Sequence, residues 1–279
     1  MGDHVSRLII IALILVAAVV PTRPAGAQDT CFTLPASYRS DELRLAAVLM
    51  KPAGLGPFPA VVFNHSSKYG SEMQPTVEDG TPCFALVSER KWVYFVPDRR
   101  GYGRSEGPTL ARAVGNRSGL LLLLAVRTRA RQESGDIVAS VEFLSRRPFV
   151  DGSRIAAVGN ALGGLYTYLA ASTRPDAFRA IVLQGIDSGP YSELLLREMI
   201  RGAGSITASI LIQQARDGDQ APVRFAHDLT EALRRAGKDV TLRLYPGTHD
   251  LFTPESRGPD GAWGEDLVEF LARQFAKPR

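Results

Sequence analysis

Histidine and cysteine are scarce in this sequence, and their scarcity excludes several kinds of protein. Its 279 residues include four histidines and two cysteines. No second histidine and no acidic cluster accompanies His249 at the spacing of metal ligands, so neither a metal nor a cofactor is predicted. The net charge is only +4, and no run of basic residues is longer than two. Nucleic acid is therefore not an expected partner.

Long apolar runs are also absent, with one exception near the start. Leu8–Val20 follows Arg7 and is apolar, but it is too short to span a bilayer comfortably. Ala25-Gly26-Ala27 then matches the small-residue pattern of a signal cleavage site. Residues 1–27 are predicted to be a secretory signal peptide, with an uncleaved anchor as the alternative. The mature protein is then expected in the periplasm or outside the cell, without a stable membrane span.

Export decides how the two cysteines are interpreted. In an oxidising compartment a lone pair of cysteines is expected to be bridged, so a disulfide between Cys31 and Cys83 is predicted. Two separate buried thiols are the alternative. Neither cysteine is expected to be catalytic, because nothing nearby indicates a partner base.

Short apolar runs alternate with segments of helical periodicity along the rest of the chain, without internal repeats. This order predicts one α/β domain over residues 28–279, with a mostly parallel sheet covered by helices on both faces. The expected strands are residues 43–50, 60–63, 92–96, 155–158, 180–184, 209–214 and 240–245. The expected helices are residues 83–89, 136–146, 165–171, 191–201, 223–236 and 264–275.

Residues 107–135 depart from this alternation of short apolar runs and helical segments. Leu120–Leu124 is a run of five leucines, with arginines on both sides. One interpretation is a flap or cap-like insertion with an apolar edge that faces a substrate. The other is a helix packed on the core.

A glycine-rich turn joins the strand at residues 155–158 to the helix at residues 165–171. Its sequence is Gly159-Asn160-Ala161-Leu162-Gly163-Gly164. Strand, tight turn and helix in this order resemble the nucleophile elbow, G-x-S-x-G, of α/β-hydrolases. The flanking glycines permit the sharp turn that lifts the central side chain above the sheet. The central residue, however, is Ala161 and not serine.

Further motifs carry the same resemblance over about residues 43–275. They are Phe63-Asn64-His65, Asp98-Arg99-Arg100-Gly101-Tyr102-Gly103-Arg104-Ser105, Gln214-Ala215-Arg216-Asp217, Tyr245-Pro246-Gly247-Thr248-His249 and Trp263-Gly264. Together they are similar to the dienelactone hydrolase and prolyl-oligopeptidase-like branch of the α/β-hydrolases. The resemblance implies an α/β-hydrolase fold and a Ser-His-Asp type of site. Its substrate would be a small ester or lactone.

The site residues follow from this resemblance and from the ends of the predicted strands. His249 is the only histidine after the last strand, and it is assigned as the catalytic base. Asp217 is assigned as the acid, with Asp219 as the alternative. The oxyanion hole would use the N–H of Leu162 and one from the loop at His65 or Ser66.

The alanine at the nucleophile position leaves two hypotheses about function. The first is a secreted esterase or dienelactone hydrolase-like protein whose serine is replaced by Ala161. The second is a non-catalytic relative that binds an ester-like or apolar small molecule in the pocket that holds the substrate in active hydrolases. Such an alanine arises through natural decay of a hydrolase, or through deliberate replacement of the serine to trap a complex.

Overall fold

The computed structural model describes residues 31–66, 83–186, 192–248 and 262–278. Within these residues the strands are β1 (Cys31–Ser40), β2 (Leu43–Pro52), β3 (Phe58–Asn64), β4 (Val93–Pro97), β5 (Val150–Asn160), β6 (Ala180–Gln184), β7 (Ser209–Ala215) and β8 (Val240–Tyr245). The helices are η2 (Cys83–Glu89), α2 (Leu110–Val114), α3 (Gly119–Ser145), α4 (Leu162–Thr173), α5 (Ser192–Gly202), η4 (Ala203–Ser205), α6 (Gln220–Arg235) and α7 (Ala262–Ala276).

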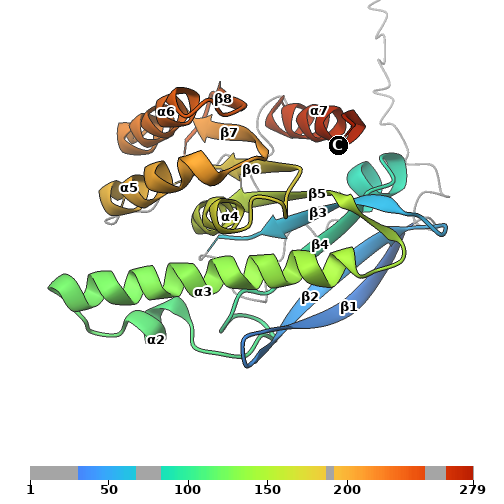
Figure 1. The fold of residues 1–279 in the computed structure, drawn as a ribbon, viewed down its shortest axis with the longest axis horizontal. Coiled ribbons are helices and arrows are strands. Elements are labelled where there is room, and N and C mark those ends of the chain that lie inside the picture. Colours follow the sequence, from blue (N-terminus) through green and yellow to red (C-terminus); the bar gives the residue numbers. More distant parts are fainter. Residues whose placement is uncertain (1–30, 67–82, 187–191, 249–261, 279) are drawn as a thin grey trace, which may run out of the picture.

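One sheet of eight strands forms the centre of the described chain, in the order β1-β2-β4-β3-β5-β6-β7-β8. The pairs from β4 to β8 are all parallel, whereas β2 pairs antiparallel with both β1 and β4. Helices cover both faces: α3, α4, α5 and α6 on one, η2 and α7 on the other (Figure 1). This is the α/β-hydrolase fold that the sequence predicted.

Burial on both faces explains the short apolar runs of the inner strands. In β3 the side chain of Val62 joins the core beneath α3 and α4, while that of Val61 joins the core beneath α7. Because neighbouring side chains of a strand point to opposite faces, a strand covered on both sides is apolar at successive positions.

The outer part of the sheet differs from the prediction. β1 was not expected, since Pro35 and the polar residues near it weaken the strand pattern. It forms because it lies at the edge of the sheet, where a proline is tolerated, and because it pairs with β2 over its whole length.

The helix expected at residues 136–146 is the second half of a much longer helix. α3 begins at Gly119 and includes all five leucines of Leu120–Leu124. Together with α2 it occupies most of residues 107–135, where a flap or a packed helix had been proposed. Val126 and Ala130 are buried, but the first turns extend beyond the sheet (Figure 1). Among the described residues, no helix is both long enough and apolar enough to cross a membrane.

Candidate functional site

The turn between β5 and α4 has the geometry of an elbow. Ala161 adopts φ 47° and ψ −117°, a conformation that residues with a side chain rarely adopt. Its N–H donates to the Gln184 carbonyl oxygen at 2.9 Å, and its own carbonyl accepts from the N–H of Gly164 at 3.0 Å. These hydrogen bonds hold the strained residue at the start of α4, next to the end of β6.

Glycine is required on both sides of Ala161 by close backbone packing. A Cβ on Gly159 would lie 2.5 Å from the Gly163 carbonyl oxygen, and one on Gly163 would overlap the Asn64 carbonyl oxygen. Both separations are shorter than real Cβ contacts, so neither position accepts a side chain without movement of the backbone. The elbow and the end of β3 are therefore packed directly against each other.

We predict that replacing Ala161 by glycine stabilises the protein. Glycine adopts a positive φ without the steric penalty of a Cβ, and a strained residue of this kind costs about 1–3 kcal/mol. Part of that gain is lost to the greater entropy of glycine in the unfolded chain, so an increase of about 1 kcal/mol in the free energy of unfolding is expected. Urea unfolding of the two proteins measures it. A loss of stability would contradict the strain assigned to Ala161.

The predicted oxyanion loop lies beside this elbow. Asn64, at the end of β3, donates from its side-chain amide to the Thr167 hydroxyl of α4 at 2.8 Å. His65 and Ser66 follow it and are both buried. Leu162 is the first residue of α4, and the first N–H groups of a helix have no acceptor within the helix. The structure thus brings the backbone of the His65 loop and the N–H end of α4 to one edge of the sheet.

The ring of His65 is fixed by two contacts on opposite nitrogens. Nε2 accepts from the Arg99 backbone N–H at 3.3 Å, so Nδ1 carries the proton and donates to the Ser66 carbonyl oxygen at 2.8 Å. Burial, together with the positive charge of Arg99, lowers the pKa of His65 to about 4. The imidazole is consequently neutral at pH 7, and it links the oxyanion loop to the turn after β4.

This low pKa predicts a pH-dependent loss of stability. As the pH falls from 6.5 toward 4, the unfolded chain binds a proton on His65 before the folded protein does. The contribution to stability is therefore fully present above pH 6.5 and is lost as the pH falls through about 4. We expect the free energy of unfolding to fall about 3 kcal/mol further between pH 7 and pH 4 in the unmodified protein than in His65→Gln. The free energies are measured by urea titration at both pH values. An equal change with pH in the two proteins would contradict this.

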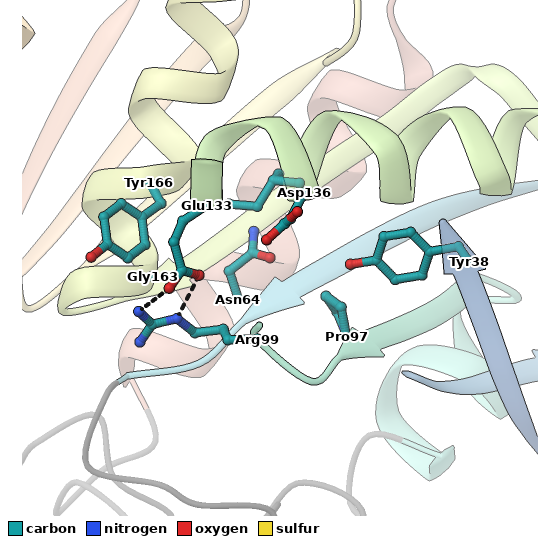
Figure 2. Close-up of a pocket in the computed structure, with 9 residues that line it drawn as sticks. Tyr38, Asn64, Pro97, Arg99, Glu133, Asp136, Gly163 and Tyr166 are labelled. Carbon is teal, nitrogen blue, oxygen red and sulfur yellow. Dashed lines mark hydrogen bonds and ion pairs between the residues drawn. The ribbon is translucent and has the colours of Figure 1, made fainter. Parts of the chain in front are cut away.

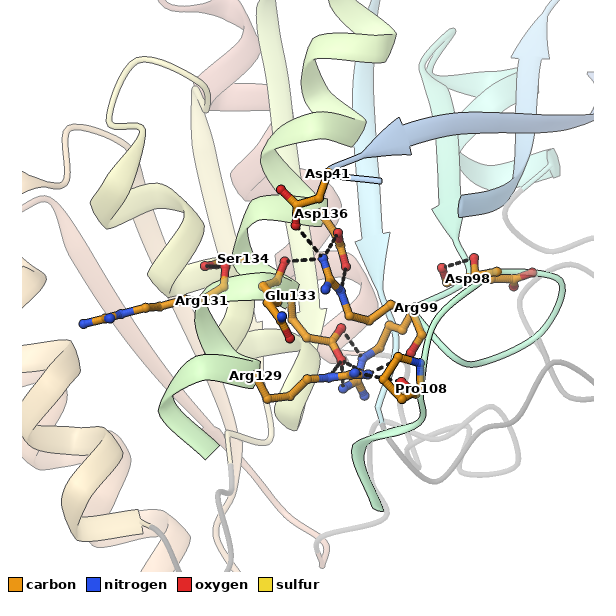
Figure 3. Close-up of polar contacts among 12 residues, drawn as sticks. Asp41, Asp98, Arg99, Pro108, Arg129, Arg131, Glu133, Ser134 and Asp136 are labelled. Atoms are coloured by element: carbon orange, nitrogen blue, oxygen red, sulfur yellow. Dashed lines mark hydrogen bonds and ion pairs between the residues drawn. The ribbon is translucent and has the colours of Figure 1, made fainter. Parts of the chain in front are cut away.

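A buried ionic cluster, absent from the sequence prediction, joins the turn after β4 to α3 (Figure 3). It is next to the oxyanion loop, because the Arg99 N–H donates to His65. Arg99 binds Glu133 of α3 through two hydrogen bonds of 3.0 and 2.8 Å, and Arg129 binds the same carboxylate at 2.8 Å. Arg100 binds both oxygens of Asp136 at 2.6 Å. Burial raises the pKa of Glu133, but the two arginines outweigh it and leave the pKa below its ordinary value. The cluster anchors the turn after β4 to α3.

The signal for this cluster was present in the sequence, but it was incomplete. Glu133 and Asp136 are three residues apart and share one face of a helix. Only a helix that begins before residue 133 places both of them opposite Arg99 and Arg100, and the predicted helix began at residue 136.

A small cavity separates this cluster from the elbow (Figure 2). Asn64, Arg99, Glu133 and Gly163 are among its lining residues, and its volume is about 10 Å³. That is room for about one water molecule, which is far too little for an ester. The cavity therefore belongs to the packing beneath the site.

The two candidate acids have different surroundings. The Asp217 carboxylate accepts from the Gly247 N–H at 2.7 Å, and its own N–H donates to the Gly247 carbonyl at 3.0 Å. Asp217 is thereby attached to the loop that leads to His249. Asp219 instead caps α6, where its side chain accepts from the Ala221 N–H at 2.9 Å.

Several predicted features lie outside the described residues. His249 is one of them, so its distance from Asp217 stays a prediction, as does the signal peptide at residues 1–27. The side chains of Cys31 and Cys83 are also outside, although β1 and η2, which begin at these residues, are in contact. The disulfide remains a prediction.

Comparison with known proteins gives a family and a set of structural neighbours. The family model described as "Dienelactone hydrolase family" matches residues 93–270. The comparison with curated protein sequences gives no match.

Solved structures share the fold at low sequence identity. An acetyl xylan esterase from Paenibacillus sp. R4 is 17% identical, with a TM-score of 0.66 over 88% of this chain and 84% of that one. A Klebsiella pneumoniae protein that is named as a dienelactone hydrolase is 18% identical, with a TM-score of 0.65 over 89% of this chain and 99% of that one. An acylaminoacyl peptidase from Pyrococcus horikoshii is 21% identical, with a TM-score of 0.67 over 90% of this chain and 42% of that one. The chain thus spans less than half of the peptidase.

The family match covers more than half of the chain, and it includes β4, the elbow and the loops after β7 and β8. The glycine-packed elbow and the parallel sheet agree with it. The protein is therefore a member of the dienelactone hydrolase family, with the α/β-hydrolase fold.

Proposed function

We propose that this protein binds a small ester or lactone at the carboxyl edge of its sheet, and that Ala161 occupies the position of the nucleophilic serine. The observation that carries the proposal is the conformation of Ala161. A strained backbone persists only where the surrounding structure imposes it, and such strain gathers at functional sites. An alanine gains nothing from this φ, whereas a serine would gain an exposed and correctly aimed hydroxyl.

The proposed site binds the carbonyl group of the ligand through backbone N–H groups. One donor is Leu162, at the positive end of the α4 dipole, and the second comes from His65 or Ser66. Because these donors belong to the backbone, replacement of the serine side chain leaves them in place. The ligand's carbonyl oxygen would accept both hydrogen bonds.

His249 and Asp217 complete the proposed site as base and acid. The hydrogen bonds between Asp217 and Gly247 support this choice, because Gly247 is two residues from His249. Asp219 is the less suitable acid, since its carboxylate already caps α6. A methyl group cannot attack a carbonyl carbon, so the protein with Ala161 is proposed to bind its ligand without forming an acyl intermediate.

Export is part of the proposal. Residues 1–27 have the pattern of a signal peptide, and an oxidising compartment would favour the bridge between Cys31 and Cys83. The mass of the purified exported chain, measured before and after reduction, checks both features.

Ligand-detected nuclear magnetic resonance with a short-chain p-nitrophenyl ester tests the proposed binding. We expect binding to the unmodified protein and loss of binding in Ala161→Leu, whose larger side chain fills the space above the elbow. Ala111→Leu, on the exposed side of α2, is the matched control and should bind normally. A fluorophosphonate probe, which reports an activated serine, should not label the unmodified protein. Equal binding by Ala161→Leu, or labelling of the unmodified protein, would refute the proposal.

A further inference from the structure

The first turns of α3 expose an unusual group of apolar side chains. Leu120, Leu121 and Leu124 are 69%, 65% and 48% exposed. Leu124 is four residues after Leu120 and three after Leu121, so it neighbours both of them on the helix surface. We call these three residues the leucine patch. Single exposed leucines are ordinary on protein surfaces, but a contiguous group at a projecting helix end indicates an interaction surface.

The surroundings of the leucine patch are basic. Between Glu106 and Glu133 the sequence contains five arginines and no acidic residue. Two of the five are engaged inside the fold, because Arg129 binds Glu133 and Arg127 binds Glu198 of α5.

The other three arginines of this segment are Arg112, Arg117 and Arg131, and all are exposed. No carboxylate in the described part of the chain pairs with them. Arg117 caps the end of α2, where its guanidinium donates to the carbonyls of Ala113 and Val114. Arg131 is seven residues after Leu124, on the same exposed side of α3, and points away from the buried cluster (Figure 3).

We propose that the leucine patch and these three arginines form a docking surface for an anionic phospholipid membrane. The projecting helix end would place leucine side chains at the boundary between headgroups and acyl chains, while the arginines contact lipid phosphates. A partner that is apolar inside and negatively charged outside matches both features at once. The contact is peripheral, and it is independent of the proposed ester site.

Site-specific fluorescence tests where the protein meets the membrane. Leu121→Trp in the full chain is mixed with vesicles of equal parts phosphatidylglycerol and phosphatidylcholine, and its emission should shift to shorter wavelength as the indole leaves water. Leu55→Trp is the matched control, since Leu55 is 93% exposed and lies in the turn between β2 and β3. It should not shift. Residues 1–27 are the same in both proteins, so any contact that they make with the vesicles affects both equally. A difference between the two proteins therefore reports the leucine patch itself.

Vesicle sedimentation measures what each part of the surface contributes. Replacing all three leucines of the patch by serine should weaken binding at least about tenfold, since burial of apolar area is lost. Arg112→Gln, Arg117→Gln and Arg131→Gln combined should weaken it roughly a hundredfold, at about fivefold for each arginine. Vesicles of phosphatidylcholine alone should bind weakly, and added salt should reduce binding to anionic vesicles.

Three results would overturn the proposal. The first is an equal shift, or no shift, in Leu121→Trp and Leu55→Trp. The second is vesicle binding that neither set of substitutions changes. The third is self-association without vesicles that is lost with the three leucines, which would make the patch an interface between two copies of the chain.

Discussion

Ala161→Ser is expected to convert this protein into an esterase. Loss of the serine in a serine hydrolase removes nearly all turnover, so its return should raise the rate on a short-chain p-nitrophenyl ester by roughly a thousand-fold or more over the unmodified protein. The backbone of Ala161 already has the elbow conformation, and Gly159 and Gly163 hold it there. A serine Oγ would therefore be placed without rearrangement. Labelling by a fluorophosphonate should appear together with the activity.

A second substitution added to Ala161→Ser tests which residues act as base and acid. His249→Ala should remove the restored activity, because the serine would lose its base. Asp217→Asn should also reduce it strongly, whereas Asp219→Asn should leave most of it, since an asparagine can still cap α6. The opposite result for the two aspartates would move the acid to Asp219. A folded but inactive Ala161→Ser protein would contradict the proposed site as a whole.

Glu133→Gln is expected to produce the largest loss of stability. The carboxylate is 2% exposed and forms ion pairs with two buried arginines, Arg99 and Arg129. Removing one partner of a buried ion pair leaves uncompensated charge in a poorly solvated place, at a cost of about 3–5 kcal/mol. Urea unfolding at pH 7 measures the difference.

Glu142→Gln provides the control for this experiment. Glu142 pairs with Arg174 at 2.8 Å, but both side chains are more than 40% exposed, so a loss below about 1 kcal/mol is expected. Adding Arg99→Met to Glu133→Gln should recover part of the stability, because one unpaired charge is removed. Similar losses for Glu133→Gln and Glu142→Gln would show that the buried cluster contributes little.

The sequence by itself determined the layers of the fold and the place of the elbow. Strands such as Ala180–Gln184 and Val240–Tyr245 were predicted with the bounds that the structure shows. Their apolar runs are short and uninterrupted, as burial on both faces of a parallel sheet requires. The elbow was equally evident from its glycines. Gly159 is required by packing within the elbow, whereas Gly163 is required by packing against Asn64 at the end of β3.

Only the tertiary structure decided the elements that depend on partners distant in sequence. β1 has a weak strand pattern and forms through its pairing with β2. In α3, the five leucines hide the helical period and Gly135 disfavours a helix by about 1 kcal/mol, so local signals underestimated its length. Buried contacts of Val126 and Ala130 and the ion pairs of Glu133 outweigh that cost.

The same distinction applies to the candidate site. Asp217 and Asp219 are two residues apart and chemically identical. The sequence could therefore distinguish their roles only by their positions after the preceding strand. In the structure one carboxylate binds the loop after β8 and the other caps a helix, because the chain turns between them into α6. Local residue chemistry fixed which groups could act, whereas long-range packing decided what each one contacts.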